Sequence, residues 1–250
     1  MNHAVLLQKL CSFGITGSLL QWCEINRRRR VVLDGISSSW SDVSSGVPQG
    51  SLLGPLFFVI FISDLPEVVL PGSTIALYAD DCKCSRIIDT AGDLELFQQD
   101  LDSLHQWSVR NFMNFNVKKC KIMKITKKIQ PLTSSFFLES SELEEVREFK
   151  DLGIITNHHL SWNPHIDYIA SKANRMLGLI KRTWKGLDDP KTLRTLYCSS
   201  VRSNLEYCSV VWSRYTKRNT DKLERVQRRA TKLILKSDDP YDIRDRKSVV

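Results

Sequence analysis

Apolar residues recur at helical spacing in three segments of the first 113 residues. We expect amphipathic helices over residues 5–14, around residues 19–22 and over residues 90–113. The third segment gives the clearest pattern, because Leu94, Phe97, Leu101, Leu104 and Trp107 fall on one face. Asp and Gln residues separate them, so the opposite face is expected to meet solvent.

Other segments have the short apolar runs and turn residues that are typical of strands. Residues 31–33 are expected to form a strand that turns at Asp34-Gly35 and returns through residues 37–40. Residues 73–85 predict two short strands around Ala79-Asp80-Asp81, and further strands are expected at 122–125 and 148–155. The first 157 residues therefore predict a mixture of helices and strands.

After residue 157 the pattern becomes helical. Asn163-Pro164 and Asp189-Pro190 each place a capping residue before a proline, the usual start of a helix. A third helix is expected at 220–235, with Leu223, Val226, Ala230 and Leu233 on one face. The pattern predicts three regions: a mixed domain at 1–157, a helical region at 158–236 and a polar tail at 237–250.

Charge distinguishes the two halves of the chain. The net charge is +8; residues 1–125 carry 12 basic and 12 acidic residues, whereas residues 126–250 carry 24 and 16. A basic field concentrated in the helical region favours a polyanion, most often nucleic acid. A solvated surface explains the charge equally well, so charge alone leaves both interpretations open.

The cysteines and the longest apolar run bear on the compartment. Seven cysteines include no C-x-x-C pair, so neither a zinc site nor a disulfide framework is expected. The longest apolar run, Leu52 to Ile62, is about half the length of a membrane span and predicts a buried helix or strand. No signal peptide is visible. We therefore expect an intracellular protein, nuclear or cytoplasmic, that is not secreted and has no membrane partner.

The first candidate for a metal-binding site is the sequence Tyr78-Ala79-Asp80-Asp81. An apolar strand here delivers two adjacent carboxylates to a tight turn. Neighbouring anions repel each other, so a cation beside them would stabilise the arrangement. Hard oxygen ligands suit Mg²⁺, which binds a few carboxylates together with substrate phosphates. Taken alone, an Asp-Asp turn is a weak signal, because most such pairs are simply solvated.

A second unusual string runs from Ser45 to Pro55, about 30 residues upstream. It contains three glycines and two prolines around Gln49, and an apolar segment follows it. Glycine allows backbone to approach a ligand closely, and proline fixes a turn. A structural loop that leads into a buried helix is the alternative, but it does not explain a glutamine at the apex.

Together these motifs resemble the reverse transcriptases of non-LTR retrotransposons. The resemblance rests on the run from Gly46 to Pro55, on Ile62-Ser63-Asp64-Leu65-Pro66 and on the Tyr-Ala-Asp-Asp turn. It continues through Asn116, Lys119 and Cys120, through Phe149 to Gly153, and through Leu223 to Gln227. It covers nearly the whole chain, from residue 2 to about residue 236.

The resemblance implies a fold, an activity and partners. The fold would be α+β: an incomplete right-hand polymerase palm, with an antiparallel sheet and helices, followed by a basic helical, thumb-like region. The activity would be RNA-directed DNA synthesis with Mg²⁺ or Mn²⁺. The partners would be an RNA template, a DNA primer and deoxynucleoside triphosphates.

It also implies roles for individual residues. Asp80 and Asp81 would bind metal, and Lys119 would lie near the pyrophosphate, although Lys118 and Lys121 compete for that role. Four further groups follow from the resemblance: a template- and nucleotide-binding loop at Gly46, Pro48, Gln49, Gly50 and Ser51; Tyr78 beside the nucleotide; a primer grip at Phe149, Leu152 and Gly153; and backbone contacts from Arg225, Arg228, Arg229 and Lys232. Cys82 and Cys84 are expected to pack in a strand rather than to bind metal. His165 is expected to face outward from Ile166 and to pack or to cap the helix rather than to bind a ligand.

The sequence departs from the family pattern in two places. The family's third carboxylate belongs to a motif that precedes the segment matched by Asn2-His3, and the 250 residues begin after it. The junction between Trp22 and Arg27 is also shorter than usual. We therefore expect the chain by itself to be inactive. The alternatives are a nucleic-acid-binding remnant without catalysis, and a fragment with no independent role.

Overall fold

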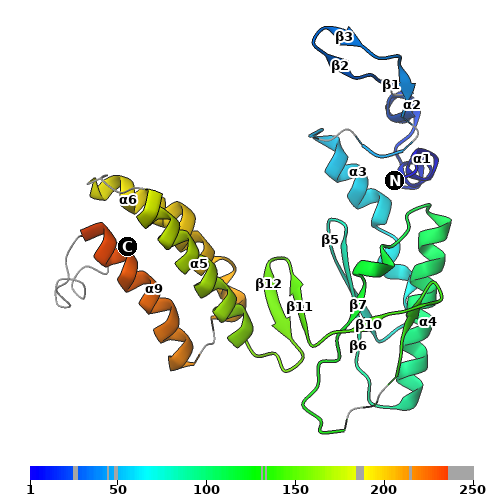
Figure 1. Cartoon of the computed structure of the whole chain (residues 1–250). Coiled ribbons are helices and arrows are strands. Elements are labelled where there is room, and N and C mark those ends of the chain that lie inside the picture. The colour runs from blue at the N-terminus through cyan, green and yellow to red at the C-terminus, as the bar shows by residue number, and fades with distance from the viewer. Residues whose placement is uncertain are drawn as a thin grey trace. The chain divides into compact units, whose positions relative to one another are not determined.

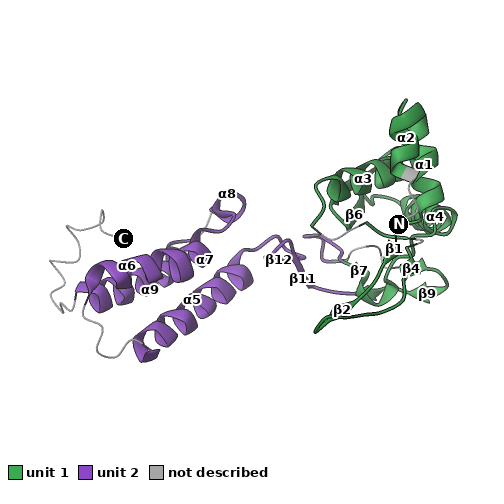
Figure 2. Cartoon of the chain, turned by 90° about the horizontal axis from the view of Figure 1, so that it is seen from above, with its two compact units in different colours: residues 1–122, 130–144 green, residues 123–129, 145–250 purple. Residues whose placement is uncertain are grey.

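The computed structural model describes residues 1–24, 28–43, 45–47, 50–130, 132, 134–183, 189–213 and 216–235. The chain forms two compact units (Figure 2). Unit 1 is Met1–Ile122 with Gln130–Glu144, and unit 2 is Met123–Ile129 with Glu145–Val250. The boundary expected at residue 157 stays a prediction, and the expected tail at 237–250 lies outside the described residues.

Unit 1 combines helices with short hairpins (Figure 1). Its helices are α1 (His3–Ser12), α2 (Gly17–Glu24), α3 (Leu53–Ile62), η1 (Leu65–Val68), α4 (Ala91–Arg110) and η2 (Val117–Lys119). Its strands are β1 (Arg28–Arg29), β2 (Val32–Leu33), β3 (Ile36–Ser37), β4 (Ser41–Asp42), β5 (Ser73–Tyr78), β6 (Asp81–Arg86), β7 (Lys121–Ile122), β8 (Phe137–Leu138) and β9 (Ser141–Glu142), and β10 (Glu144–Glu145) begins at its end.

The helices α1, α2 and α4 form where periodicity predicted them. The α4 helix begins at a capping box, in which the Thr90 side chain accepts from the Asp93 N–H and the Asp93 carboxylate accepts from the Thr90 N–H. For the apolar run from Leu52 to Ile62, the sequence predicted either a helix or a strand. This run forms the helix α3, which buries Phe57 and Phe61. Both pack in one core with Leu101 and other apolar residues of α4.

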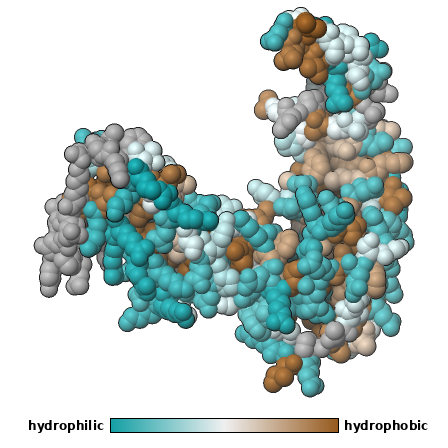
Figure 3. Space-filling view, viewed as in Figure 1, coloured by the Kyte–Doolittle hydropathy of each residue, from teal (hydrophilic) through white to brown (hydrophobic). Residues whose placement is uncertain are grey.

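The β2–β3 hairpin turns at the expected place, since Asp34 and Gly35 both have positive φ. Its apolar residues Val31, Val32, Leu33 and Ile36 are exposed. Figure 3 shows hydrophobic atoms among polar ones on the surface of this hairpin. The shortened junction lies partly outside the described residues, at Ile25, Asn26 and Arg27. The strand expected at 122–125 is only the two residues of β7.

Unit 2 is a hairpin followed by packed helices. Its elements are β11 (Glu148–Asp151), β12 (Ile154–Asn157), α5 (Asn163–Thr183), α6 (Pro190–Leu196), the π-helix η3 (Tyr197–Arg202), α7 (Ser203–Glu206), α8 (Ser209–Trp212) and α9 (Lys217–Leu235). The single strand expected at 148–155 was wrong, because Leu152 and Gly153 both have positive φ and turn the chain into a hairpin.

The start of α6 has its predicted cap, whereas α5 begins at Asn163 itself, whose Oδ1 accepts from the Asn219 Nδ2 at 2.7 Å. The Asp189 carboxylate accepts from the backbone N–H groups of Lys191 and Thr192, and Pro190 stands at the first helical position of α6. Val226 and Ala230 of α9 are buried in one core with Ile166 and other apolar residues of α5. The chain is thus a mixed α+β protein with small sheets. Within the described residues, no helix is both long and apolar enough to cross a membrane.

Candidate active site and nucleic-acid interface

The two adjacent carboxylates lie at the bend of the β5–β6 hairpin. The strands pair from Ser73 with Arg86 to Tyr78 with Asp81, so Ala79 and Asp80 form the two-residue bend. Ala79 has a φ of 51°, a left-handed conformation that costs a non-glycine residue about 1–3 kcal/mol. The folded hairpin therefore maintains backbone strain next to the carboxylates.

The hairpin alternates between a core face and a solvent face. Ile75, Leu77, Cys82 and Cys84 turn toward the apolar core of unit 1, as the packing interpretation of the two cysteines predicted. Burial raises the pKa of Cys82 to about 11 and that of Cys84 to about 12. Both thiols therefore stay protonated near neutral pH, which makes them poor metal ligands.

The candidate metal-binding residues and Tyr78 lie on the solvent-exposed side of the hairpin. Tyr78 is 67% exposed, and Asp80 and Asp81 are both exposed. The described residues include no cluster of three or more His, Cys, Asp or Glu groups that could hold a metal ion. Two exposed carboxylates nevertheless fit part of a Mg²⁺ ligand set, since Mg²⁺ usually keeps several waters and binds phosphates as well.

A buried ion pair that the sequence pattern did not predict holds the open end of the hairpin. Asp100 of α4 is fully buried and accepts hydrogen bonds from the Leu70 N–H, the Ser73 hydroxyl and the Arg86 Nε. The Arg86 side chain is only 6% exposed, and its Nη2 also donates to the Pro71 carbonyl at 3.1 Å. This network fixes both strands of the carboxylate hairpin to α4.

A second missed network involves Asp64 of the Ile-Ser-Asp-Leu-Pro motif. Its Oδ1 accepts from the Lys9 Nζ at 2.6 Å and from the Trp107 Nε1 at 3.0 Å. Lys9 also lies over the rings of Phe61 and Trp107, with Nζ 4.9 and 5.0 Å from their centroids. Asp64 therefore joins α1, α3 and α4, and this contact gives the motif a structural role.

The glycine-rich loop is described only in part, because Pro48 and Gln49 lie outside the described residues. Gly46 has a φ of 85°; its N–H donates to the Met1 carbonyl and its carbonyl lies 2.7 Å from the His3 Nε2. Gly50 also has a positive φ, of 80°. The Ser51 hydroxyl accepts from the Gly54 N–H at 3.1 Å at the start of α3. A Cβ at Gly54 would lie only 2.8 Å from that hydroxyl, so the turn requires glycine there.

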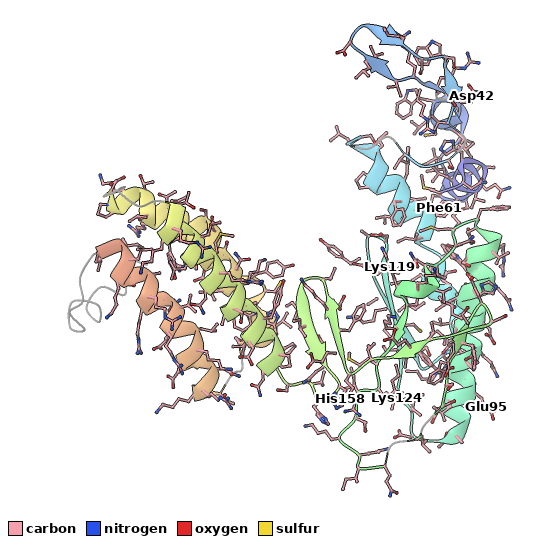
Figure 4. All side chains as sticks on the ribbon, viewed as in Figure 1. Asp42, Phe61, Glu95, Lys119, Lys124 and His158 are labelled. Carbon is pink, nitrogen blue, oxygen red and sulfur yellow. The ribbon has the colours of Figure 1, made fainter. Side chains whose placement is uncertain are left out.

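Lys119 ends the short helix η2 and is exposed. Its N–H donates to the Asn116 carbonyl at 2.8 Å, which fixes the backbone and leaves the amine in solvent. Lys119 is labelled in Figure 4. The predicted carboxylates, the glycine-rich loop and Lys119 therefore all belong to unit 1.

The predicted primer grip and the predicted phosphate contacts belong to unit 2. Phe149 and Leu152 of the β11–β12 hairpin are 40% and 45% exposed, and Gly153 completes the bend. On α9 the four predicted basic residues are all exposed: Arg225, Arg228, Arg229 and Lys232. Glu224 pairs with Arg228 at 2.6 Å, and the Asn174 Oδ1 accepts from the Arg229 Nη1 at 2.9 Å.

His165 does not face outward, as its position next to Ile166 suggested. It is 1% exposed, its ring lies 5.6 Å from that of Trp212, and its Nδ1 accepts from the Ile155 N–H. The packing role was therefore correct and the orientation was wrong. The reason is that α5 is covered on two sides, by β12 and by Trp212, so its buried face is wider than a single stripe.

We expect His165 to make unit 2 less stable in acid. Burial, with Lys150 nearby, lowers the pKa of His165 below its ordinary value of 6.5. The unfolded chain then binds more protons below pH 6.5, so this contribution to stability is complete above 6.5 and is lost as the pH falls. The free energy of unfolding should fall by up to about 1.4 kcal/mol per pH unit. Urea titrations between pH 5 and 8 should show this slope, and His165→Gln should flatten it while the exposed-site control His159→Gln retains it.

The site and fold define a class of protein before any comparison: a mixed α+β chain whose hairpin presents paired carboxylates. The family model described as reverse transcriptase (RNA-dependent DNA polymerase) matches residues 1–156. That is more than half of the 250 residues, so the chain belongs to the reverse transcriptase family.

Similar curated proteins come from non-LTR retrotransposons of flies. The chain is 33% identical over 150 residues to the RNA-directed DNA polymerase from mobile element jockey of Drosophila funebris, covering 56% of this chain and 16% of that protein. It is 27% identical over 244 residues to the probable RNA-directed DNA polymerase from transposon BS of Drosophila melanogaster, covering 93% and 26%. The chain thus spans about a sixth to a quarter of the length of these relatives.

Proposed function

We propose that this chain supplies the catalytic palm hairpin and a thumb-like nucleic-acid-binding region of an RNA-directed DNA polymerase. One observation carries the proposal: Asp80 and Asp81 stand side by side at an exposed bend whose strands are fixed to the core of unit 1. Family membership independently implies metal-dependent nucleotidyl transfer.

Asp80 and Asp81 would hold Mg²⁺ or Mn²⁺, with waters and substrate phosphates as the other ligands. Divalent ions held by these carboxylates would supply activation of the attacking primer oxygen and stabilisation of the leaving pyrophosphate. Tyr78 and the loop residues Gly46, Pro48, Gln49, Gly50 and Ser51 would contact the template and the incoming nucleotide. Lys119, whose amine is in solvent, would stabilise charge on the pyrophosphate. In unit 2, the β11–β12 hairpin would contact the DNA primer, and α9 would contact phosphates of the RNA–DNA duplex.

Mn²⁺ binding tests the carboxylate bend directly. We expect Asp80→Asn and Asp81→Asn each to weaken Mn²⁺ binding by about tenfold or more, because affinity follows the number of charged ligands. Water-proton relaxation of the 250-residue chain would measure the affinity. Asp102→Asn is the matched control, since Asp102 is exposed on α4 and bonds only to Gln98 among the described contacts. Equal Mn²⁺ affinity for wild type and Asp80→Asn would exclude this bend as the metal site.

Two carboxylates on one bend cannot bridge two ions from opposite sides, as three ligands can. We therefore expect no primer extension by these 250 residues alone, because losing a ligand of the catalytic metal costs orders of magnitude in rate. Extension of an annealed primer on an RNA template, with Mg²⁺ or Mn²⁺, would measure this. Robust extension that disappears in Asp80→Ala would contradict the expectation and leave the family activity intact.

A second candidate is nucleic-acid binding without catalysis. The observation that favours it is the exposed basic face of α9, which belongs to a different compact unit from the carboxylates.

All seven cysteines are free, which supports a reducing compartment inside the cell for either function.

A further inference from the structure

The bend of the β11–β12 hairpin has a conformation that its residues do not favour. Leu152 has a φ of 46° and Gly153 a φ of 87°, so both central residues are in the left-handed region, as in type I′ turns. Asn-Gly is the usual pair for such a turn, and leucine is disfavoured because its Cβ crowds the following carbonyl. Another contact is therefore needed to hold Leu152 in this conformation.

Tyr207 makes that contact. Its hydroxyl donates to the Leu152 carbonyl at 3.0 Å, across 55 residues of sequence. Its ring also lies against Gly153, where an added Cβ would stand 3.2 Å from the Cε1 atom. The tyrosine thus touches both central residues of the bend.

The backbone of Tyr207 is itself fixed. Its carbonyl accepts from the Trp212 Nε1 at 2.9 Å, and Trp212 is 2% exposed within the core of unit 2. Cys208, the next residue, has a φ of 50° and separates α7 from α8. The core therefore holds Tyr207 through Trp212, and Tyr207 holds the bend.

Other contacts anchor the strands of the hairpin rather than its bend. Ile154 is buried in the core, and the Ile155 N–H donates to His165. Lys150 donates to the Tyr168 hydroxyl at 3.0 Å and lies over its ring. These contacts fix where the hairpin lies on the helices, whereas Tyr207 determines the shape of its tip.

We propose that Tyr207 is a positioning residue, which holds the Leu152–Gly153 bend so that the exposed face of the hairpin meets the primer strand. This inference rests on the proposed function, in which that hairpin contacts the primer. Phe149 and Leu152 present the exposed apolar surface for the contact. Tyr207 acts through the bend and does not itself bind the substrate.

A photo-crosslinking experiment tests the proposal. A benzophenone amino acid replaces Phe149 in the 250-residue chain, which is then bound to an RNA template with an annealed, labelled DNA primer. We expect crosslinks to the primer strand, and we expect Tyr207→Phe to lower their yield by about five- to tenfold, the usual effect of losing one hydrogen bond on a conformational equilibrium. The total affinity for the duplex should change less than about twofold, because no charge is lost.

Tyr168→Phe is the matched control. It also removes one hydroxyl that contacts the hairpin, but that hydroxyl bonds the Lys150 side chain instead of the bend. Its crosslinking yield should stay within about twofold of wild type. An equal loss in both variants would mean that any loosening of the hairpin matters, and it would overturn the specific role of Tyr207.

A rescue variant separates positioning from general stability. Leu152→Asn creates the Asn-Gly pair that adopts this turn unaided. Leu152 is itself part of the proposed primer surface, so the comparison is made within the Leu152→Asn background, where adding Tyr207→Phe should change the crosslinking yield by less than about twofold. A further loss of about five- to tenfold in that background would overturn the proposal. If wild type crosslinks to the primer and Tyr207→Phe does so equally, the role of Tyr207 is wrong while the proposed function stands. If wild type gives no primer crosslink, the primer contact itself is wrong and the inference falls with it.

Discussion

Replacing Asp100 with alanine should lower the free energy of unfolding of unit 1 by about 3–5 kcal/mol, because it leaves the buried Arg86 without its counterion. The side chains of Arg86 and Asp100 are 6% and 0% exposed. Asp100 also accepts from the Leu70 N–H at 2.7 Å, so the change leaves a second donor unsatisfied. A domain of ordinary stability would lose much of its folding free energy.

Hydrogen exchange of peptides that cover β5 and β6 would measure this change in unit 1 alone. Glu95→Ala is the matched control, since Glu95 is an exposed acidic residue on the same helix (Figure 4). Surface substitutions of that kind usually stay within about 0.5 kcal/mol. A loss below about 1 kcal/mol in Asp100→Ala would show that the pair is dispensable.

Removing both partners gives an independent check. The combination of Asp100→Leu with Arg86→Met should recover part of the stability, because an apolar pair avoids the cost of desolvating two charges, whereas the Leu70 N–H still lacks its acceptor. The expected pattern is a large loss for either single change and a smaller loss for both. Additive losses would instead mean that each residue contributes through separate contacts.

The sequence predicted the carboxylate hairpin because its local signals agree. Apolar residues alternate along β5, and the polar Asp80-Asp81 pair marks the bend. The α4 helix was equally predictable from its periodicity. Such elements depend on neighbours in sequence, which is the information that periodicity contains.

The supporting contacts were not predictable from the same signals. Arg86 and Asp100 belong to different elements, and nothing in their spacing distinguishes them from other charged residues on solvent-facing surfaces. Tyr207 lies 55 residues from Leu152, and His165 is buried only because β12 and Trp212 cover its side of α5. Tertiary packing decides these cases, so a pattern along one element cannot reveal them.

The β11–β12 hairpin illustrates the same limit locally. A leucine in a left-handed turn contradicts the usual turn signal, so the local pattern predicted one continuous strand over residues 148–155, and only the family resemblance indicated a turn, at Phe149 to Gly153. Gly153 is typical of such a turn, but Leu152 before it is not, so the pair does not match the usual turn pattern. Local rules failed where a distant tyrosine offsets the unfavourable backbone conformation.

Neutralising Arg225, Arg228 and Arg229 with glutamine should weaken binding to an RNA–DNA duplex by about two to three orders of magnitude at 0.1 M salt. Each phosphate contact contributes about 0.9 to the slope of log affinity against log salt for a duplex, so losing three would lower that slope by up to about 2.7. All three arginines are exposed on α9. The visible face of the helices of unit 2 is largely hydrophilic (Figure 3). Fluorescence anisotropy over a salt series would measure both quantities.

The single variants should not be equal. Glu224 already pairs with Arg228 at 2.6 Å, so part of that charge is compensated before nucleic acid binds. Arg225 forms no ion pair among the described residues, and Arg225→Gln should therefore reduce the slope more than Arg228→Gln. Glu224→Gln should raise the affinity, because it frees Arg228 for phosphate and removes a repelling charge.

A charge-matched control separates a specific surface from net charge. Replacing Arg28, Arg29 and Arg110 of unit 1 with glutamine lowers the net charge from +8 to +5, the same change as the α9 triple variant. If α9 contacts the phosphates, only the α9 variant should show a smaller slope of log affinity against log salt, because counterion release requires charges close to phosphates. Equal losses in both variants would mean that the chain attracts polyanions through its overall charge, and α9 would then have no special place in the interface.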